Sequence, residues 1–329
     1  MRIAIDAMGG DHAPGQIVQG ALEAAMEYPD TEILLVGDTA VIEPLLKGQK
    51  PANVLICHAD EVIGPDDEPV KAVRRKKGAS MVVAGQLVRE KRADAMLSAG
   101  NTGALMTTGL LVVGRMEGIE RPALVTMLPT MDDVGVLALD LGANMDAKPE
   151  HLLQYAIMGS IYRSKVFGME KPRVGLLNVG TEAKKGNELT KAAYEMLENA
   201  PINFIGNVEA RDVLHRNCDV LICDGFAGNI LLKAMEGTAG ALFSTLKEAF
   251  GSSLLTKVAA AIMMPKLRQL KKKMDYKEHG GAPLLGLNGL VVKCHGSSDV
   301  VAVKNAVRQA RIAIQANLTE SIAVEISGK

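Results

Sequence analysis

A short polar stretch between a strand and a helix carries the residue types that bind phosphate. It reads NVGTEAKKGN over Asn178–Asn187, after the apolar run Arg173–Leu177 and before Glu188–Glu198, which has helical spacing. A glycine turn that carries Lys184 just before a helix brings together backbone N–H groups, the positive end of the helix dipole and a cation. This combination predicts a phosphate site, although a surface turn with incidental lysines has the same composition.

Glycine-rich polar loops also follow most of the other expected strands. Ligands of an open α/β sheet bind at the carboxyl ends of the strands, so these loops are candidate binding segments. Ser98, Asn101 and Thr102 can donate hydrogen bonds to an anion at the start of the following helix. None of the loops has the spacing of a P-loop or of a dinucleotide fingerprint, so a small anion is the expected ligand. The loops are Asp6–Asp11, Ser98–Ala104, Asp140–Asn144, Asp224–Asn229 and His295–Asp299, with His279–Leu285 before the last strand.

The elements that must position these loops alternate along the chain. Short apolar runs are followed by helical patterns, which predicts a three-layer, doubly wound α/β sheet. A polar turn at Met131–Asp133 separates two adjacent strands, so an antiparallel hairpin is expected and the sheet is mixed. The predicted strands are 3–7, 33–37, 54–57, 93–98, 124–128, 134–140, 174–178, 202–208, 220–224 and 290–295. The predicted helices are 16–28, 81–92, 104–113, 152–163, 188–198 and 300–315.

One segment departs from this alternation. From Ile230 to about Met274 the spacing is helical, broken at Gly251–Ser253 and at Pro265, which predicts a helical hairpin that projects from the sheet. We therefore expect one α/β domain over residues 1–329 with a hairpin arm inserted at 230–275. Apolar residues near the tip share one helical face and are followed by lysines, which fits either a dimerisation arm or an interfacial membrane anchor. These apolar residues are Leu254, Leu255, Val258, Ile262 and Met263.

Composition excludes several classes of protein. The 37 basic and 38 acidic residues nearly balance, tryptophan is absent and aromatics make up 3%, so a general nucleic-acid binder with base-stacking platforms is not expected. The four cysteines have no C-x-x-C spacing and predict reduced thiols. There is no export signal and no run of about 18 apolar residues. A cytoplasmic protein is the expectation, placed peripherally at the inner face of the membrane if the arm is an anchor.

The ordered set of loops closely resembles the bacterial phosphate acyltransferases of the PlsX family. Several motifs in the same order over nearly the whole chain are far more specific than one glycine loop. The resemblance implies that inorganic phosphate attacks an acyl thioester of acyl carrier protein and gives acyl phosphate for phospholipid synthesis. It also implies an isocitrate/isopropylmalate dehydrogenase-like fold, shared with phosphotransacetylase, and a homodimer. The matching blocks are DAMGGD (Asp6–Asp11), SAGNTGA (Ser98–Ala104), DLGAN (Asp140–Asn144), NVGTEAKKGN (Asn178–Asn187), CDGFAGNILLK (Cys223–Lys233), GGAPLLG (Gly280–Gly286) and HGSS (His295–Ser298).

This reaction assigns roles to three residues. Lys184 would neutralise the phosphate or the developing oxyanion, Asp224 would orient that lysine or take the phosphate proton, and Asn229 would donate to the oxyanion. A helix N-cap is the structural alternative for Asp224. No metal ion and no cofactor are expected. The predicted substrate-binding residues are Ser98, Asn101, Thr102, Gly180, Thr181, Asn187, His279 and Gly281.

Two basic runs are candidate docking surfaces for the acidic acyl carrier protein, with solvated helix faces as the alternative. Arg74 and Arg75 belong to the first run, and Lys271 and Lys272 to the second. Three other functions are open. A phosphotransacetylase-like enzyme would use acyl-coenzyme A, a metal- and NAD-dependent dehydrogenase would need an aspartate cluster that these loops lack, and a non-catalytic scaffold would only recruit lipid enzymes to the membrane.

Overall fold

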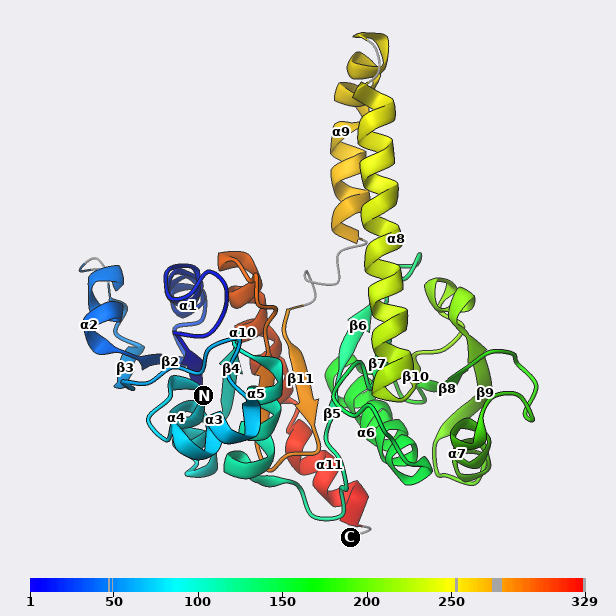
Figure 1. Ribbon diagram of the computed structural model, residues 1–329, viewed down its shortest axis with the longest axis horizontal. Helices are drawn as coiled ribbons and strands as arrows, with labels where there is room; N and C mark the ends of the chain where they lie inside the picture. The colour runs from blue at the N-terminus through cyan, green and yellow to red at the C-terminus, as the bar shows by residue number, and fades with distance from the viewer. Residues whose placement is uncertain (47, 49, 252–253, 274–279, 328–329) are drawn as a thin grey trace.

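A computed structural model describes residues 1–46, 48, 50–251, 254–273 and 280–327, and its strands form two neighbouring sheets (Figure 1). The first sheet has the order β3-β2-β1-β4-β12-β11-β5 and the second the order β6-β7-β10-β8-β9. The strands are β1 (Arg2–Asp6), β2 (Glu32–Gly37), β3 (Val54–His58), β4 (Ala95–Ser98), β5 (Ala123–Leu124), β6 (Thr126–Leu128), β7 (Val136–Leu139), β8 (Arg173–Asn178), β9 (Asn203–Glu209), β10 (Val220–Ile222), β11 (Ala282–Leu285) and β12 (Leu290–Lys293).

Helices cover both faces of the sheets. One continuous core spans both sheets and lies under α1, α6, α7, α10 and α11, and a separate core on the opposite face of each sheet completes three layers. The predicted mixed α/β fold is confirmed, but it holds two sheets where one was expected. The helices are α1 (Gly15–Glu27), α2 (Thr39–Ile42), α3 (Pro69–Arg75), α4 (Ser80–Arg89), α5 (Thr102–Thr108), α6 (Pro149–Phe167), α7 (Glu188–Glu198), α8 (Gly225–Gly251), α9 (Leu254–Lys273), α10 (Val300–Gln315) and α11 (Leu318–Ser327), with short η turns at Glu43–Leu46, Gly109–Gly114 and Ala210–His215.

The segment predicted as a single strand over 124–128 is shared between the two sheets. Its first part, β5, pairs antiparallel with β11 of the first sheet, and its second part, β6, pairs antiparallel with β7 of the second. Val125 lies between them and donates its N–H to the Pro283 carbonyl at 3.0 Å. The change of partner at Val125 explains how a single apolar run serves two sheets. The hairpin expected around Met131–Asp133 joins β6 to β7 and is confirmed.

Strand β11 corrects a prediction. The stretch His279–Leu285 was expected to be a loop, yet β11 lies between β12 and β5 inside the first sheet. A proline in a central strand normally costs a ladder hydrogen bond because it has no N–H. Here Pro283 takes part through its carbonyl, which accepts from Val125. Helices α2, α3 and α11 were also not predicted, and Pro69 in the first turn of α3 was a start signal that was missed.

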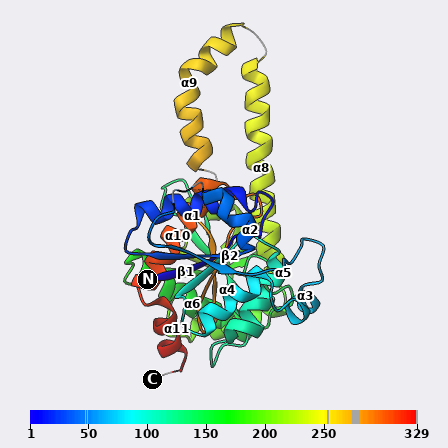
Figure 2. The same cartoon turned by 90° about the vertical axis from the view of Figure 1, so that its left-hand side faces the viewer.

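The predicted helical hairpin is present. Helix α8 begins at the carboxyl end of β10 and continues far beyond the sheets, and α9 returns beside it; the projecting part of the two helices is called the arm (Figure 1). Pro265 was expected to end a helix, but α9 runs through it. Figure 2 shows a bend in α9, as expected of a helix with an internal proline. No helix in the described residues is long and apolar enough to span a membrane.

The first turn of α8 packs directly on the backbone of the loop after β7. The N–H of Gly225 donates to the Asn144 carbonyl at 2.9 Å. A Cβ added to Gly228 would collide with the carbonyl oxygen of Asp140 and lie 2.7 Å from the Cys223 sulfur. Glycine is therefore required at this helix position by the close approach of two backbones. Further along the same helix, Gly237 has no heavy atom within 4 Å of its would-be Cβ.

Gly228→Ala is expected to lower the free energy of unfolding by roughly 1–3 kcal/mol or more, because a backbone atom must move to make room. Gly237→Ala is the matched control in the same helix and should stabilise the protein by about 0.5–1 kcal/mol, since alanine has the higher helix propensity. Urea denaturation followed by circular dichroism measures both. Equal tolerance of the two substitutions would contradict the close packing described for Gly228.

Candidate active site

A cleft of about 740 Å³ lies between the two sheets and takes residues from both. Three predicted site residues line it. Thr102 comes from the start of α5, Asn229 from the first turn of α8, and Gly281 from the segment that leads into β11. The loop His295–Asp299, which follows β12, forms much of the wall on the first sheet's side. The structure therefore joins loops that are far apart in the sequence into one site.

The loops of the first sheet interlock through short backbone contacts. The N–H of Asp11 donates to the Gly296 carbonyl at 2.8 Å, which ties the loop after β1 to the loop after β12. Beneath them the buried carboxylate of Asp6 accepts hydrogen bonds from the hydroxyls of Ser80 and Ser98, both at 2.6 Å. Burial raises the pKa of Asp6. The hydroxyl of Ser98 thus donates its hydrogen bond to Asp6, and Ser98 is not part of the cleft lining.

Asn101 and Asn187 occupy equivalent places at two helix starts. The side-chain oxygen of Asn101 accepts from the N–H of Ala104 at 3.0 Å and caps α5, and its amide donates to the Pro65 carbonyl at 3.0 Å. The side-chain oxygen of Asn187 accepts from the N–H of Thr190 at 2.9 Å and caps α7. Neither residue lines the cleft. In the structure both side chains hold helix ends.

Lys184 lies on the exposed surface of the loop after β8. The loop is pinned from below by Asn178, whose amide donates to the Lys185 carbonyl and to Asn207, each at 3.1 Å. Gly180 is buried in this loop, while Lys184 and Thr181 are exposed and are not part of the cleft lining. Because β8 pairs with β10, this loop is the neighbour of the loop that carries Asp224 and Asn229.

Asp224 caps helix α8. Its carboxylate accepts from the N–H of Ala227 at 2.8 Å, in the first turn of the helix whose next residues enter the cleft. The capping alternative considered from the sequence is thus present in the structure. Lys233 lies one turn beyond Asn229 in the cleft and pairs with Glu236 at 2.8 Å. The second carboxylate oxygen of Glu236 is shielded from solvent and has no partner in the described part of the chain.

Lys293, the last residue of β12, lines the cleft and was not predicted. Its ammonium donates to the carbonyl of Cys294, and it sits beside Ser98 in the parallel pairing of β12 with β4. Burial lowers the pKa of Lys293, partly opposed by the charges of Asp11 and Asp6. A lysine at the end of an apolar strand, two residues before the glycine loop His295–Asp299, is the sequence signal that would have found it.

The remaining predicted residues lie elsewhere. Arg74 and Arg75 are exposed in the last turn of α3, whose first residue, Pro69, packs against Gly103 at the start of α5. Val258, Ile262 and Met263 are exposed on α9. His279 lies outside the described residues, and Leu254, Leu255, Lys271 and Lys272 are within α9 without described side chains.

The comparisons with known proteins agree over the whole chain. Residues 1–321 match the family described as "Fatty acid synthesis protein". The chain belongs to this family. A phosphate acyltransferase from Brevibacillus brevis is 60% identical over 322 residues, covering 98% of this chain and 96% of the relative. A phosphate acyltransferase from Oceanobacillus iheyensis is 57% identical over 331 residues, covering 100% of this chain and 99% of the relative. The family resemblance stated from the seven loop blocks is confirmed.

Solved structures with a similar fold are much more distant in sequence. A phosphotransacetylase from Streptococcus pyogenes superposes with a TM-score of 0.60 at 17% identity, covering 96% of this chain and 94% of that one. A 4-hydroxythreonine-4-phosphate dehydrogenase from Klebsiella pneumoniae gives a TM-score of 0.54 at 13% identity, covering 95% and 99%. This member of the fatty acid synthesis protein family therefore shares its fold with proteins of different names.

In this family member the loop after β7 is held by a buried carboxylate. Asp140 accepts from the N–H groups of Leu124, Ala143 and Asn144 at 3.1, 3.1 and 2.5 Å, and from the Asn144 amide at 3.2 Å. That amide also donates to Tyr155 at 2.9 Å. Burial raises the pKa of Asp140 to about 6, since loss of solvent outweighs these donors. The network fixes the loop next to Asn229 in the cleft.

Asp140→Asn should destabilise the protein by roughly 1–3 kcal/mol, because an amide nitrogen would face N–H donors. The cost should depend on pH. The pKa of Asp140 is about 6 in the folded protein and 3.8 ordinarily. Between these two pH values the carboxyl is more often protonated in the folded than in the unfolded protein. The contribution of Asp140 to the free energy of unfolding therefore falls as pH rises through this window. The variant lacks that titration. Urea unfolding should therefore show that the variant's free energy of unfolding falls further below the wild-type value at about pH 4 than at about pH 7. A larger difference at the higher pH would contradict this prediction.

Proposed function

We propose that this chain is a phosphate acyltransferase that moves a fatty acyl group from acyl carrier protein to inorganic phosphate and so supplies acyl phosphate for phospholipid synthesis. The observation that carries the proposal is the cleft, which sets the cationic group of Lys293 and the glycine loop His295–Asp299 against apolar residues from the second sheet. Phosphate and an acyl chain need these two environments side by side. Relatives named phosphate acyltransferase support the same reaction.

The reaction needs positioning more than covalent help. An oxygen of hydrogen phosphate attacks the thioester carbon, the carbon–sulfur bond breaks, and the phosphate proton ends on the released thiol. Phosphate is largely ionised near neutral pH, and a thiol with a pKa of about 8.5 is a good leaving group. A fixed cation and fixed N–H donors lower the barrier by stabilising the oxyanion on the thioester carbon. Lys293 is the candidate for this cation because it lines the cleft.

Lys184, Asp224 and Asn229 stay proposed catalytic residues beside Lys293. Asn229 is supported by its place in the cleft, and Asp224 by its position one turn before it. Lys184 is supported only by the pairing of its strand with β10 and by its long side chain. Substrate contacts are proposed for the predicted binding residues, of which Thr102 and Gly281 line the cleft. We also propose that the fold is related to that of isocitrate/isopropylmalate dehydrogenases. The chain would then be one domain with the arm as an insertion.

Phosphate-dependent release of thiol from acyl carrier protein thioester, with acyl phosphate as product, tests this function. Offering acyl-coenzyme A in parallel separates a phosphotransacetylase-like enzyme, which would prefer that thioester. Lys293→Met and Lys184→Ala should each lower turnover by at least roughly 100-fold, the scale of losing one preorganised donor. Lys185→Ala is the matched control, because this neighbouring lysine is exposed and has no assigned role.

If Lys184→Ala kept near wild-type turnover, Lys184 would have no part in catalysis and Lys293 would be the remaining candidate for the cation. If the wild-type protein released no thiol from either thioester, the enzyme proposal would fail and a scaffold would be favoured.

Arg74 and Arg75 are proposed to dock acyl carrier protein near the cleft. Both are exposed at the end of α3, while the start of the same helix touches the start of α5 at the cleft. Five or six residues of helix span only about 8–9 Å, so the backbone at Arg74 and Arg75 lies about that far from the contact with α5. Such charges attract an acidic partner, and their effect weakens with salt. The run with Lys271 and Lys272 is proposed as a second docking surface at the base of the arm.

The arm is proposed to contact either lipid or the second subunit of a homodimer. Val258 and Ile262 are 60% and 77% exposed and lie four residues apart, on one helical face of α9. Exposed large apolar side chains in this spacing mark an interaction surface. Lipid contact through the tip would place this enzyme peripherally at the membrane in the cytoplasm.

Val258→Glu together with Ile262→Glu should abolish co-sedimentation with anionic vesicles, because two buried charges oppose insertion at the interface. Met26→Glu with Val324→Glu is the matched control, since both residues are exposed on the body of the protein and the change in charge is equal. Analytical ultracentrifugation of the same variants reports the dimer. Vesicle binding that persists while the dimer dissociates would assign this face to the partner subunit instead of lipid.

A further inference from the structure

Part of the cleft wall on the second sheet's side is apolar, beside the polar residues Asn229, Lys233 and Glu236 of α8. It combines residues of β6 and β7 with the last turns of α6, whereas the opposite wall carries Lys293 and the polar loop His295–Asp299. A ligand that fits both walls has an apolar chain and a polar or anionic head. The cleft volume is within the range of pockets that enclose such ligands. The apolar wall consists of Val125, Met127, Leu137, Tyr162 and Phe167.

A buried arginine fixes this wall from behind. Arg163 is fully buried, donates to the Gly135 carbonyl at 2.7 Å, touches the Met127 sulfur at 3.6 Å, and lies 4.9 Å from the centre of the Phe167 ring. The Tyr162 and Phe167 rings are 5.9 Å apart. A guanidinium buried without a carboxylate bonded to it is unfavourable in itself. Its contacts hold two members of the wall in place, so the wall is preorganised.

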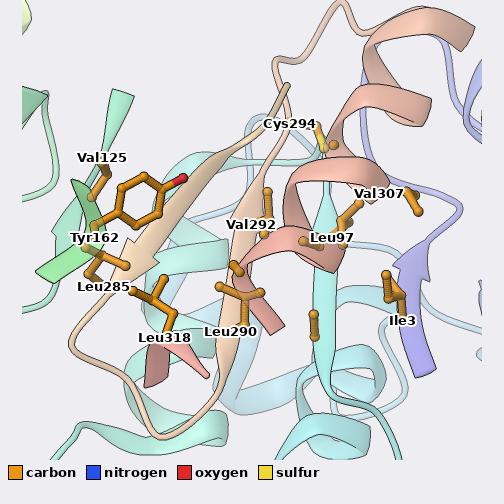
Figure 3. Packing of buried hydrophobic residues seen from close by; sticks show 14 of the residues in the cluster. Ile3, Leu97, Val125, Tyr162, Leu285, Leu290, Val292, Cys294, Val307 and Leu318 are labelled. Atoms are coloured by element: carbon orange, nitrogen blue, oxygen red, sulfur yellow. The ribbon is translucent and has the colours of Figure 1, made fainter. Parts of the chain in front are cut away.

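Tyr162 carries a polar atom that the described part of the chain leaves unpaired. The residue is 5% exposed and lines the cleft, and no hydrogen bond of its hydroxyl is present among the described residues. Figure 3 shows its ring between Val125 and Leu285, with the hydroxyl pointing away from both. Burial raises the pKa of Tyr162 to about 12, so the group keeps its proton. A hydroxyl in the wall of a cleft, without a protein partner, can donate to an acceptor on a ligand.

We infer that the fatty acyl chain of the substrate lies against Met127, Tyr162 and Phe167, with its thioester carbonyl accepting the hydrogen bond of Tyr162. The carbonyl is the acceptor that an acyl chain on this wall carries. Phe167 ends α6 and is 42% exposed, so it marks where the wall meets solvent and where the last methylenes of a long chain lie. The inference rests on the proposed acyl transfer and adds the residues that select the chain.

The test compares kcat/KM for phosphate-dependent thiol release from acyl carrier protein thioesters whose chains differ by two methylenes. In the wild-type protein each methylene that reaches the wall should raise kcat/KM by up to about fourfold. Phe167→Ala should lower the value for long chains by about tenfold and leave short chains unchanged within about twofold, because only long chains reach the ring. Tyr162→Phe should lower kcat/KM equally for substrates of all chain lengths, by about three- to tenfold, since every substrate has the thioester carbonyl.

Ile205→Ala is the matched control, because Ile205 is 41% exposed on β9 and lies outside the cleft lining. Phe167→Leu keeps an apolar side chain and should show the same change in chain preference to a smaller degree, which also tests the inference if Phe167→Ala folds poorly. An equal loss at all lengths in the Phe167 variants, or full activity of Tyr162→Phe, would overturn the inference while leaving acyl transfer intact. Absence of thiol release by the wild-type protein at every length would instead contradict the proposed function.

Discussion

The architecture depends on one extended segment that belongs to both sheets. Residues 123–128 pair first with β11 and then with β7, so the chain changes sheets without an intervening loop. The N–H of Leu124 at this crossing donates to the buried carboxylate of Asp140, which also holds the loop after β7. The crossing therefore fixes the distance between the sheets and the shape of the cleft that lies between them. A break in this segment would separate the polar wall from the apolar wall.

Much of the fold follows from local sequence patterns. Apolar runs that alternate with helical spacing identified ten of the strand segments, because strands covered on both faces are continuously apolar. The pattern could not show that 124–128 serves two sheets, since the choice of partner is made by tertiary contacts. It also missed β11, where Pro283 and flanking glycines resemble a loop. The projecting hairpin was identifiable because its spacing stayed helical without any strand signal.

The site was harder to derive than the fold. Asparagine, serine and aspartate at the ends of strands bind anions, but the same residues cap helices. Asn101, Asn187 and Asp224 form caps in the structure, and Ser98 bonds to Asp6. Sequence alone cannot separate these uses because the backbone geometry is the same in both. Lys293 was missed for a different reason: a charged residue at the end of an apolar strand is usually read as the point where the strand reaches solvent.

The cleft is lined by residues from the base of α8 and from the segment that enters β11. Leu232 and Lys233 line it from the second and third turns of α8, and the segment Gly281–Pro283, which follows α9, lines it from the other side. Helix α8 is continuous from the cleft wall into the arm, and a long helix is stiff. A tilt of α8 as a rigid body would therefore move Leu232 and Lys233 in the cleft.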